Sequence, residues 1–154
     1  NIIARLAKES DAFHVSRSPI IQHPNVSRND QPDLELFFED HKTTFVEISV
    51  VDPASATALS LRKSNIAPIS AGKFQEKQKL SKYRNIPHNI TPIILESPGA
   101  ITPSAHFFIA SLIKKLPASP SSFSSLCLKW FSLLSCALQK GNLKIFSRCL
   151  RAPL

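Results

Sequence analysis

Two carboxylates separated by thirteen residues are the first candidates for chemistry in this sequence. Asp33 precedes a short apolar run, and Glu47 lies inside the apolar run 45–50. Side chains alternate along a strand, so Glu47 would share one face with Phe45 and Ser49. A carboxylate among apolar side chains needs a compensating charge, and a divalent cation shared with a second carboxylate would supply it.

The expected ligands are those of a hard cation. Asp33, Glu47, the main-chain carbonyl of Ile48 and water would form an oxygen site suited to Mg²⁺ or Mn²⁺. Such a metal polarises a phosphodiester and lowers the pKa of an attacking water. Two structural alternatives stay open, because Pro32-Asp33 is also a common turn dipeptide and Glu47 would be solvated on a one-sided sheet.

The elements that must position these residues follow from hydrophobic periodicity and from turn residues. The pattern predicts a helix in 1–13, strands at 34–38 and 44–51 joined by the acidic turn 39–42, a helix at 71–84, a strand at 91–96, a helix that begins at Thr102 or Ser104, and helices at 121–139 and 142–150. Residues 14–33 are predicted to be irregular, and 54–62 to be either helix or loop. Gly141 is expected to end the helix 121–139.

This order of elements predicts an α/β fold, in which a small mixed central sheet is flanked by helices and followed by a helical C-terminal extension. A length of 154 residues suits a single domain. We expect its core to span about 1–116 and the extension 117–154. The chain begins at Asn1 and contains no methionine, so we expect it to be part of a longer protein.

Charge is distributed unevenly along the chain. The net charge is +8, made up of −4 over residues 1–52, +5 over 53–96 and +7 over 97–154, where there is no acidic residue. An acidic front and a basic back favour a polyanionic partner, nucleic acid first and an anionic membrane second. Hydrophobic residues make up 43%, enough to bury a core and to exclude a disordered chain.

Composition excludes several other classes. Cys127, Cys136 and Cys149 lack CxxC spacing, so neither a disulfide scaffold nor a zinc finger is predicted, and the expected compartment is reducing. The beginning of the chain has no signal-peptide pattern. The apolar run 123–138 contains Lys129 and is shorter than the roughly 20 residues that span a bilayer, so a buried helix and no membrane association are predicted.

The segment from Pro32-Asp33 to Glu47 resembles the PD-(D/E)XK nuclease motif. More closely, the chain is similar to the restriction-like endonuclease domain that follows the reverse transcriptase in some non-LTR retrotransposon polyproteins. Five segments within about 23–145 carry this similarity: QPDL (31–34), FVEISVVDP (45–53), EKQKLSKY (76–83), PIILESPG (92–99) and LSCALQKGN (134–142). The resemblance implies a restriction-endonuclease-like core and a Mg²⁺-dependent endonuclease. It also implies that the enzyme nicks target DNA in the nucleus and exposes a 3′ end for reverse transcription.

The sequence departs from the common motif in ways that affect its predicted chemistry. The common motif has a lysine two residues after the second acid, where this chain has Ser49. In the retroelement branch the lysine is displaced to the following helix as Lys-x-x-x-Tyr, which Lys79 and Tyr83 match. The resemblance implies that Lys79 positions the attacking water or stabilises charge on the phosphate, and that Tyr83 supports it by a hydrogen bond. The alternative is a solvated basic helix with Tyr83 against the sheet.

Basic residues around this helix are predicted to contact phosphates. Arg62, Lys63, Lys77, Lys82 and Arg84 are the candidates nearest the predicted site. Contacts of this kind give affinity without sequence information and make binding sensitive to salt. The expected partner is DNA, with element RNA as a further partner through an upstream part, and no small-molecule cofactor is expected.

Three function classes remain open at this point. The first is the metal-dependent endonuclease, and the second is an inactive, degenerate nucleic-acid-binding module. The two further departures from the family, Gln31 in place of arginine and Glu47 in place of aspartate, are compatible with the second class. The third is a helical interaction module that docks a partner on the apolar face of 123–138. Glu9 and Glu96 are weaker candidate ligands, for which a solvated carboxylate is the expected alternative.

Overall fold

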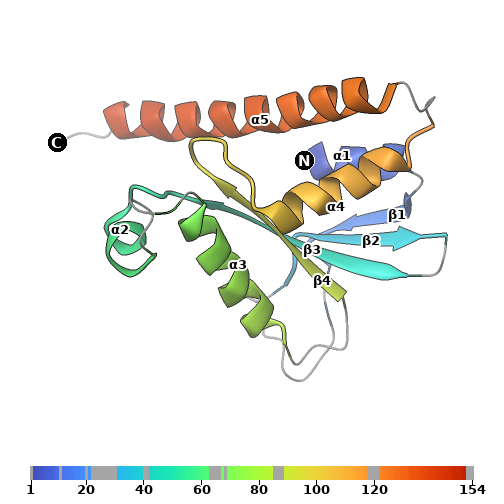
Figure 1. The fold of residues 1–154 in the computed structure, drawn as a ribbon, viewed down its shortest axis with the longest axis horizontal. Helices are drawn as coiled ribbons and strands as arrows, with labels where there is room; N and C mark the ends of the chain where they lie inside the picture. Colours follow the sequence, from blue (N-terminus) through green and yellow to red (C-terminus); the bar gives the residue numbers. More distant parts are fainter. Residues whose placement is uncertain are drawn as a thin grey trace.

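A four-stranded mixed sheet with the strand order β1-β2-β3-β4 lies at the centre of the computed structural model (Figure 1). The structure describes residues 2–10, 12–19, 21, 31–39, 42–62, 67, 69–84, 89–117 and 122–151. Its elements are α1 (Ile2–Glu9), β1 (Ala12–Arg17), β2 (Leu34–Phe38), β3 (Thr43–Val51), α2 (Ala56–Arg62), α3 (Ser70–Lys82), β4 (Asn89–Glu96), α4 (Pro103–Lys114) and α5 (Phe123–Arg151).

The connections explain the directions of the strands. β1 pairs antiparallel with β2, and β2 pairs antiparallel with β3. β3 pairs parallel with β4, from Thr44 opposite Asn89 to Val51 opposite Glu96. Two parallel neighbours need a long crossover, and α2 and α3 provide it. The α/β class with a small mixed sheet and flanking helices is therefore confirmed.

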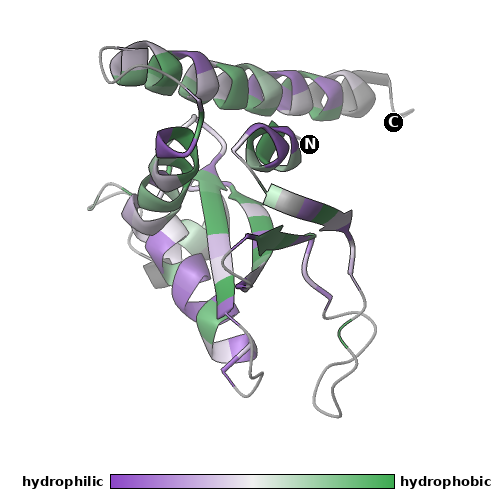
Figure 2. Ribbon diagram, turned by 90° about the vertical axis from the view of Figure 1, so that its right-hand side faces the viewer, coloured by the Kyte–Doolittle hydropathy of each residue, from purple (hydrophilic) through white to green (hydrophobic). Residues whose placement is uncertain are grey.

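The helices form two layers on opposite faces of the sheet (Figure 1). α1, α4 and α5 cover one face, where the largest core cluster joins strand residues such as Val46 and Ile93 to Trp130 and Leu134 of α5. α3 covers the other face, where smaller clusters form around Phe45 with Tyr83 and around Ile94. Figure 2 shows the apolar strands between these layers. Because β3 and β4 are covered on both faces, a polar side chain in the middle of β3 is buried.

Strand β1 is the element that the sequence pattern missed. It occupies 12–17, which the pattern divided between the end of a helix and an irregular segment. The strand is short, and its alternation of apolar Phe13 and Val15 with polar His14 and Ser16 covers only four residues, too few to separate it from the helical pattern that precedes it. Its register is set by pairing with β2, which comes later in the chain, so local periodicity does not reveal it.

The predicted end of the helix at Gly141 was wrong. α5 runs without a break from Phe123 to Arg151, so the two predicted C-terminal helices are one. A glycine inside a helix costs only about 1 kcal/mol relative to alanine. The helix is also held beyond the glycine, because the Asn142 side-chain amide donates to the Ser97 carbonyl at 2.8 Å. None of the helices in the described ranges is both long enough and apolar enough to span a bilayer.

Candidate functional site

Glu47 lies in the middle of β3 on the face covered by α3, and its side chain is almost fully buried. The Lys79 ammonium donates to Glu47 Oε1 and forms an ion pair with it. The Tyr83 hydroxyl donates to Glu47 Oε2 at 3.1 Å. Both oxygens of the carboxylate therefore accept hydrogen bonds from α3 and its C-cap residue, across a sequence separation of more than thirty residues.

Helix α3 brings the two donors to Glu47 because of their spacing. Residues four apart lie on the same helix face, so Lys79 and Tyr83 point together toward the sheet. The Tyr83 ring is 4% exposed and packs with Phe45 and Ile90. Tyr83 is therefore packed against the sheet, as the alternative interpretation expected. Its hydroxyl also makes a polar contact with Glu47.

The first turn of α3 is fixed by a buried carboxylate at the end of β4. Glu96 is 6% exposed, and its Oε1 accepts the Gly72 backbone N–H at 3.0 Å. A carboxylate at a helix N-terminus satisfies a free N–H and interacts favourably with the helix dipole. The solvated end-of-strand carboxylate expected for Glu96 was wrong. Glu96 anchors the helix that carries Lys79.

Asp33 lies at the point where β2 begins. Its backbone N–H donates to the Val46 carbonyl at 3.0 Å, and its Oδ2 accepts the Ile48 backbone N–H at 2.6 Å. The register of β2 on β3 ends at the pair of Leu34 with Val46. The Asp33 carboxylate thus continues the ladder by one step and lies against the residue that follows Glu47.

The oxygen atoms of Asp33, Glu47 and Ile48 are of the type that a hard cation binds. The N–H and C=O of one strand residue point to the same side, so the Ile48 carbonyl also points to the side where the Asp33 carboxylate lies. Together with the carboxylates of Asp33 and Glu47, it would supply oxygen donors of the kind that Mg²⁺ and Mn²⁺ take. Within the described part of the chain, no three His, Cys, Asp or Glu side chains gather to hold a metal ion. A cation here would therefore depend on two carboxylates, the carbonyl and water.

The remaining carboxylate candidate lies elsewhere on the structure. Glu9 is on the surface of α1, and its Oε1 accepts from Arg5 Nε at 2.9 Å as an exposed i, i+4 pair. This is the solvated helix-surface charge that was predicted as the alternative to a metal ligand.

The predicted phosphate-contacting residues divide into two groups. Lys77, Lys82 and Arg84 are exposed on α3 and at its end, on the helix that carries Lys79. The Lys82 ammonium lies 5.0 Å from the centre of the Tyr83 ring. Arg62 is at the end of α2, and its side chain is not described. Lys63 lies outside the described residues.

Sequence reasoning missed one further polar contact. Glu76 of α3 accepts a hydrogen bond from the Ser104 hydroxyl, in the first turn of α4. The residue types alone gave no signal for it, because each residue is common on an exposed helix. The contact shows that α3 is held by polar bonds to β3, β4 and α4.

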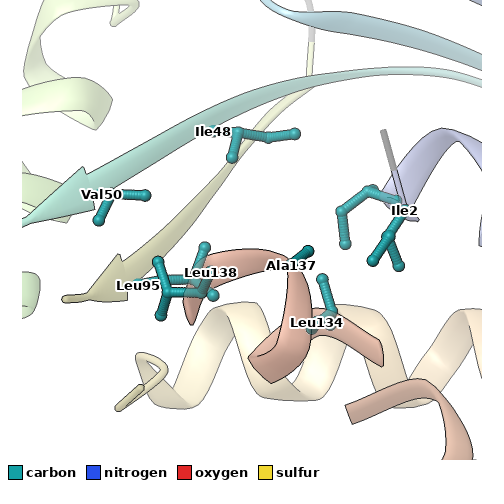
Figure 3. Close-up of a pocket in the computed structure, with 8 residues that line it drawn as sticks. Ile2, Ile48, Val50, Leu95, Leu134, Ala137 and Leu138 are labelled. Carbon is teal, nitrogen blue, oxygen red and sulfur yellow. The ribbon is translucent and has the colours of Figure 1, made fainter. Parts of the chain in front are cut away.

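An apolar hollow lies behind β3, on the face away from Glu47 (Figure 3). Its volume is about 250 Å³, and it is lined by Ile2, Ile3, Ile48, Val50, Leu95, Leu134, Ala137 and Leu138. Ile48 and Val50 reach it because strand residues alternate between faces. None of the described residues that line the hollow is titratable, so they offer no group for acid–base or metal chemistry.

Comparison of the chain with protein-family models, with curated proteins and with solved structures found no match.

Proposed function

We propose that this chain is a metal-dependent DNA endonuclease domain that hydrolyses a phosphodiester, and that it is part of a larger retroelement protein. The observation that carries the proposal is the meeting of Glu47 with Lys79. These residues were selected by a motif that spans three separate segments of the sequence, and the fold brings them into contact. The Asp33 carboxylate lies against the very next residue of β3.

Each residue of the proposed site has a role that its position supports. Asp33, Glu47 and the Ile48 carbonyl would hold Mg²⁺ or Mn²⁺, which supplies positive charge to polarise the phosphate and acidify a bound water. Lys79 holds an ammonium beside the carboxylate, where it would stabilise charge that develops on the phosphate. Tyr83 orients the Glu47 carboxylate through its hydroxyl. Lys77, Lys82 and Arg84 would contact neighbouring phosphates of DNA in the nucleus.

Conversion of a supercoiled plasmid to the nicked circle in Mg²⁺ or Mn²⁺ tests this proposal. We expect nicking by the unmodified protein and a loss of at least about 100-fold in Asp33→Asn and in Lys79→Met, because each removes charge from the reaction centre. Glu39→Gln is the matched control. It also removes one carboxylate, but from an exposed position beyond the far end of β2, and should nick normally. Equal inertness of the unmodified protein and Asp33→Asn would refute the enzymatic proposal.

One observation favours a second candidate, an inactive nucleic-acid-binding module. Both Glu47 oxygens accept bonds from Lys79 and Tyr83, so the buried carboxylate is compensated without a metal. A degenerate copy could keep its fold with this arrangement alone. Salt-dependent DNA binding with no nicking in either metal would support this candidate over the enzyme.

A further inference from the structure

Helix α5 carries an exposed row of basic residues that the candidate site does not use. Lys129, Lys140 and Lys144 are all exposed. At about 100° per residue they fall within an arc of about 60° around the helix, and about 22 Å separates the first from the last along the axis. Figure 2 shows hydrophilic residues recurring along this helix. We call these three lysines the α5 row.

The neighbouring helices of the same layer also carry cations. Arg5 of α1 and Lys129 both lie over the Trp130 ring, at 5.4 and 5.6 Å from its centre. Lys114 and Lys115 are exposed at the end of α4. The sequences of α1, α4 and α5 contain a single acidic residue, Glu9, which is paired with Arg5. This whole helical layer is therefore basic, and its positive charge is not neutralised from within.

The row and the candidate site lie on different sides of the sheet. Glu47 faces α3, whereas α5 packs over the opposite face together with α1 and α4 (Figure 1). The sheet and a layer of core side chains separate them. A nucleic-acid segment seated at Glu47 would therefore not reach the phosphate-binding groups of the α5 row without passing around the domain.

The chemistry of α5 favours nucleic acid over a lipid surface. A helix that lies in a membrane interface needs one continuous apolar face for the lipid. The apolar face of α5 that holds Trp130 and Leu134 is buried in the core. Among the described side chains of α5, the exposed apolar residues Leu128, Leu143 and Ile145 are spread over about 160° of the helix and form no such face.

We propose that the α5 row, with Arg5 beside it, is a second nucleic-acid contact surface that binds the phosphate backbone of a segment other than the one at Glu47. This proposal rests on the proposed function only in assuming that a first nucleic-acid segment binds at Glu47. Lysines spaced along one helix side act as point charges for phosphates and give no base readout. The surface should therefore bind duplexes of any sequence, with strong dependence on salt.

Binding of a fluorescent duplex, measured by anisotropy in EDTA across a range of salt concentrations, tests the surface without catalysis. In the triple variant Lys129→Gln, Lys140→Gln, Lys144→Gln we expect at least about tenfold weaker binding at low salt. We also expect a salt slope that is lower by about 2 to 3, since each phosphate contact contributes about 0.9. The triple arginine variant keeps the charge and should keep the slope. An unchanged slope in the glutamine variant would overturn the proposal.

Capture of a second duplex tests whether the protein binds two nucleic-acid segments at once or only one. A duplex fixed to a surface should retain a second, labelled duplex through the unmodified protein at concentrations where it is monomeric, and not through the glutamine triple variant. Failure of the unmodified protein to bridge the two duplexes would refute separate segments. If the glutamine triple variant lost binding to anionic vesicles but bound DNA as the unmodified protein does, the α5 row would be a membrane-binding surface instead. The triple variant keeps Asp33 and Lys79, on which the proposed nicking depends. The proposed endonuclease activity and the proposed second contact surface can therefore fail independently.

Discussion

Glu47 is a buried carboxylate that needs polar partners for stability and is also a residue of the candidate site. A buried carboxylate without partners is costly, and this one is satisfied by an ammonium and a phenol from α3. Under the proposed function, the same contacts would place a cation where a phosphodiester is attacked. Stability and the proposed catalysis would then depend on the same side chains, so variants at this site need to be measured for both.

Replacing Lys79 with methionine should destabilise the fold more than a surface substitution does. The change leaves Glu47 buried and short of its counter-charge, which we expect to cost about 2–3 kcal/mol of unfolding free energy. Adding Glu47→Gln removes the uncompensated charge, so the double variant should regain part of this loss. Urea denaturation of the four proteins of this cycle measures the coupling.

Lys77→Met is the matched control for this cycle. It removes a lysine of the same helix from an exposed position, and its effect should stay within about 0.5 kcal/mol. Additive effects of Lys79→Met and Glu47→Gln would mean that the ion pair contributes nothing to the fold. The stabilising role given to it here would then be wrong.

The site could be anticipated in part, residue by residue. The spacing of Lys79 and Tyr83 is enough to predict that they share one helix face, and alternation along β3 is enough to place Glu47 on the face of Phe45. Local spacing does not predict which helix covers that face, because this depends on the crossover from β3 to β4. For the same reason Glu96 was predicted to be solvated, although it is buried and accepts a hydrogen bond from Gly72 in the first turn of α3.

At the scale of elements, predictability depends on how local the deciding interactions are. The hairpin of β2 and β3 combines apolar runs with a short acidic turn, and it was predicted to within a residue. β1 depends on pairing with a distant strand, and it was missed. The sequence pattern divides α5 at Gly141 because glycine is a local helix-stop signal, whereas the helix continues through it to Arg151.

The two helical glycines should respond to alanine in opposite directions. A Cβ at Gly141 meets nothing within 4 Å, so Gly141→Ala should stabilise the protein by about 0.5–1 kcal/mol through helix propensity. A Cβ at Gly72 would lie 3.0 Å from Thr102 Cγ2, where α3 approaches the start of α4 closely. Gly72→Ala should therefore destabilise the protein by about 1–3 kcal/mol. Chemical denaturation of both variants measures the sign of each change in unfolding free energy.

Each glycine is the control for the other, because the substitution is the same. A destabilising Gly141→Ala would show that α5 ends or bends at this residue, as the sequence alone suggested. A neutral Gly72→Ala would show that α3 can move away from Thr102, and would weaken the case that Glu96 fixes the start of the helix.

At the scale of the whole molecule, the sheet separates two surfaces of different character. The α3 side carries the buried carboxylate with its donors, and the α1, α4 and α5 side carries cations with one paired acid. Exposed cations lie on both sides, because Lys77, Lys82 and Arg84 are on α3 or at its end, so the two surfaces differ in the buried carboxylate and not in the sign of their charge. The basic last third of the chain is placed behind the site, because α5 returns across the far face of the sheet.

Whether α5 is an extension or part of one folding unit can be tested with Trp130. This is the only tryptophan of the chain, it is fully buried, and it belongs to the same cluster as residues of α1, α4 and the sheet. We expect its fluorescence and the far-ultraviolet circular dichroism to report one coincident urea transition. Leu134→Ala should shift both signals together by about 2–4 kcal/mol, because it opens a cavity in the shared core. Leu128→Ala, at an exposed position of the same helix, should shift neither. An early fluorescence transition, followed by unfolding of the sheet at higher urea, would instead make α5 a separable extension, and the α5 row would then be a surface on a unit that can detach.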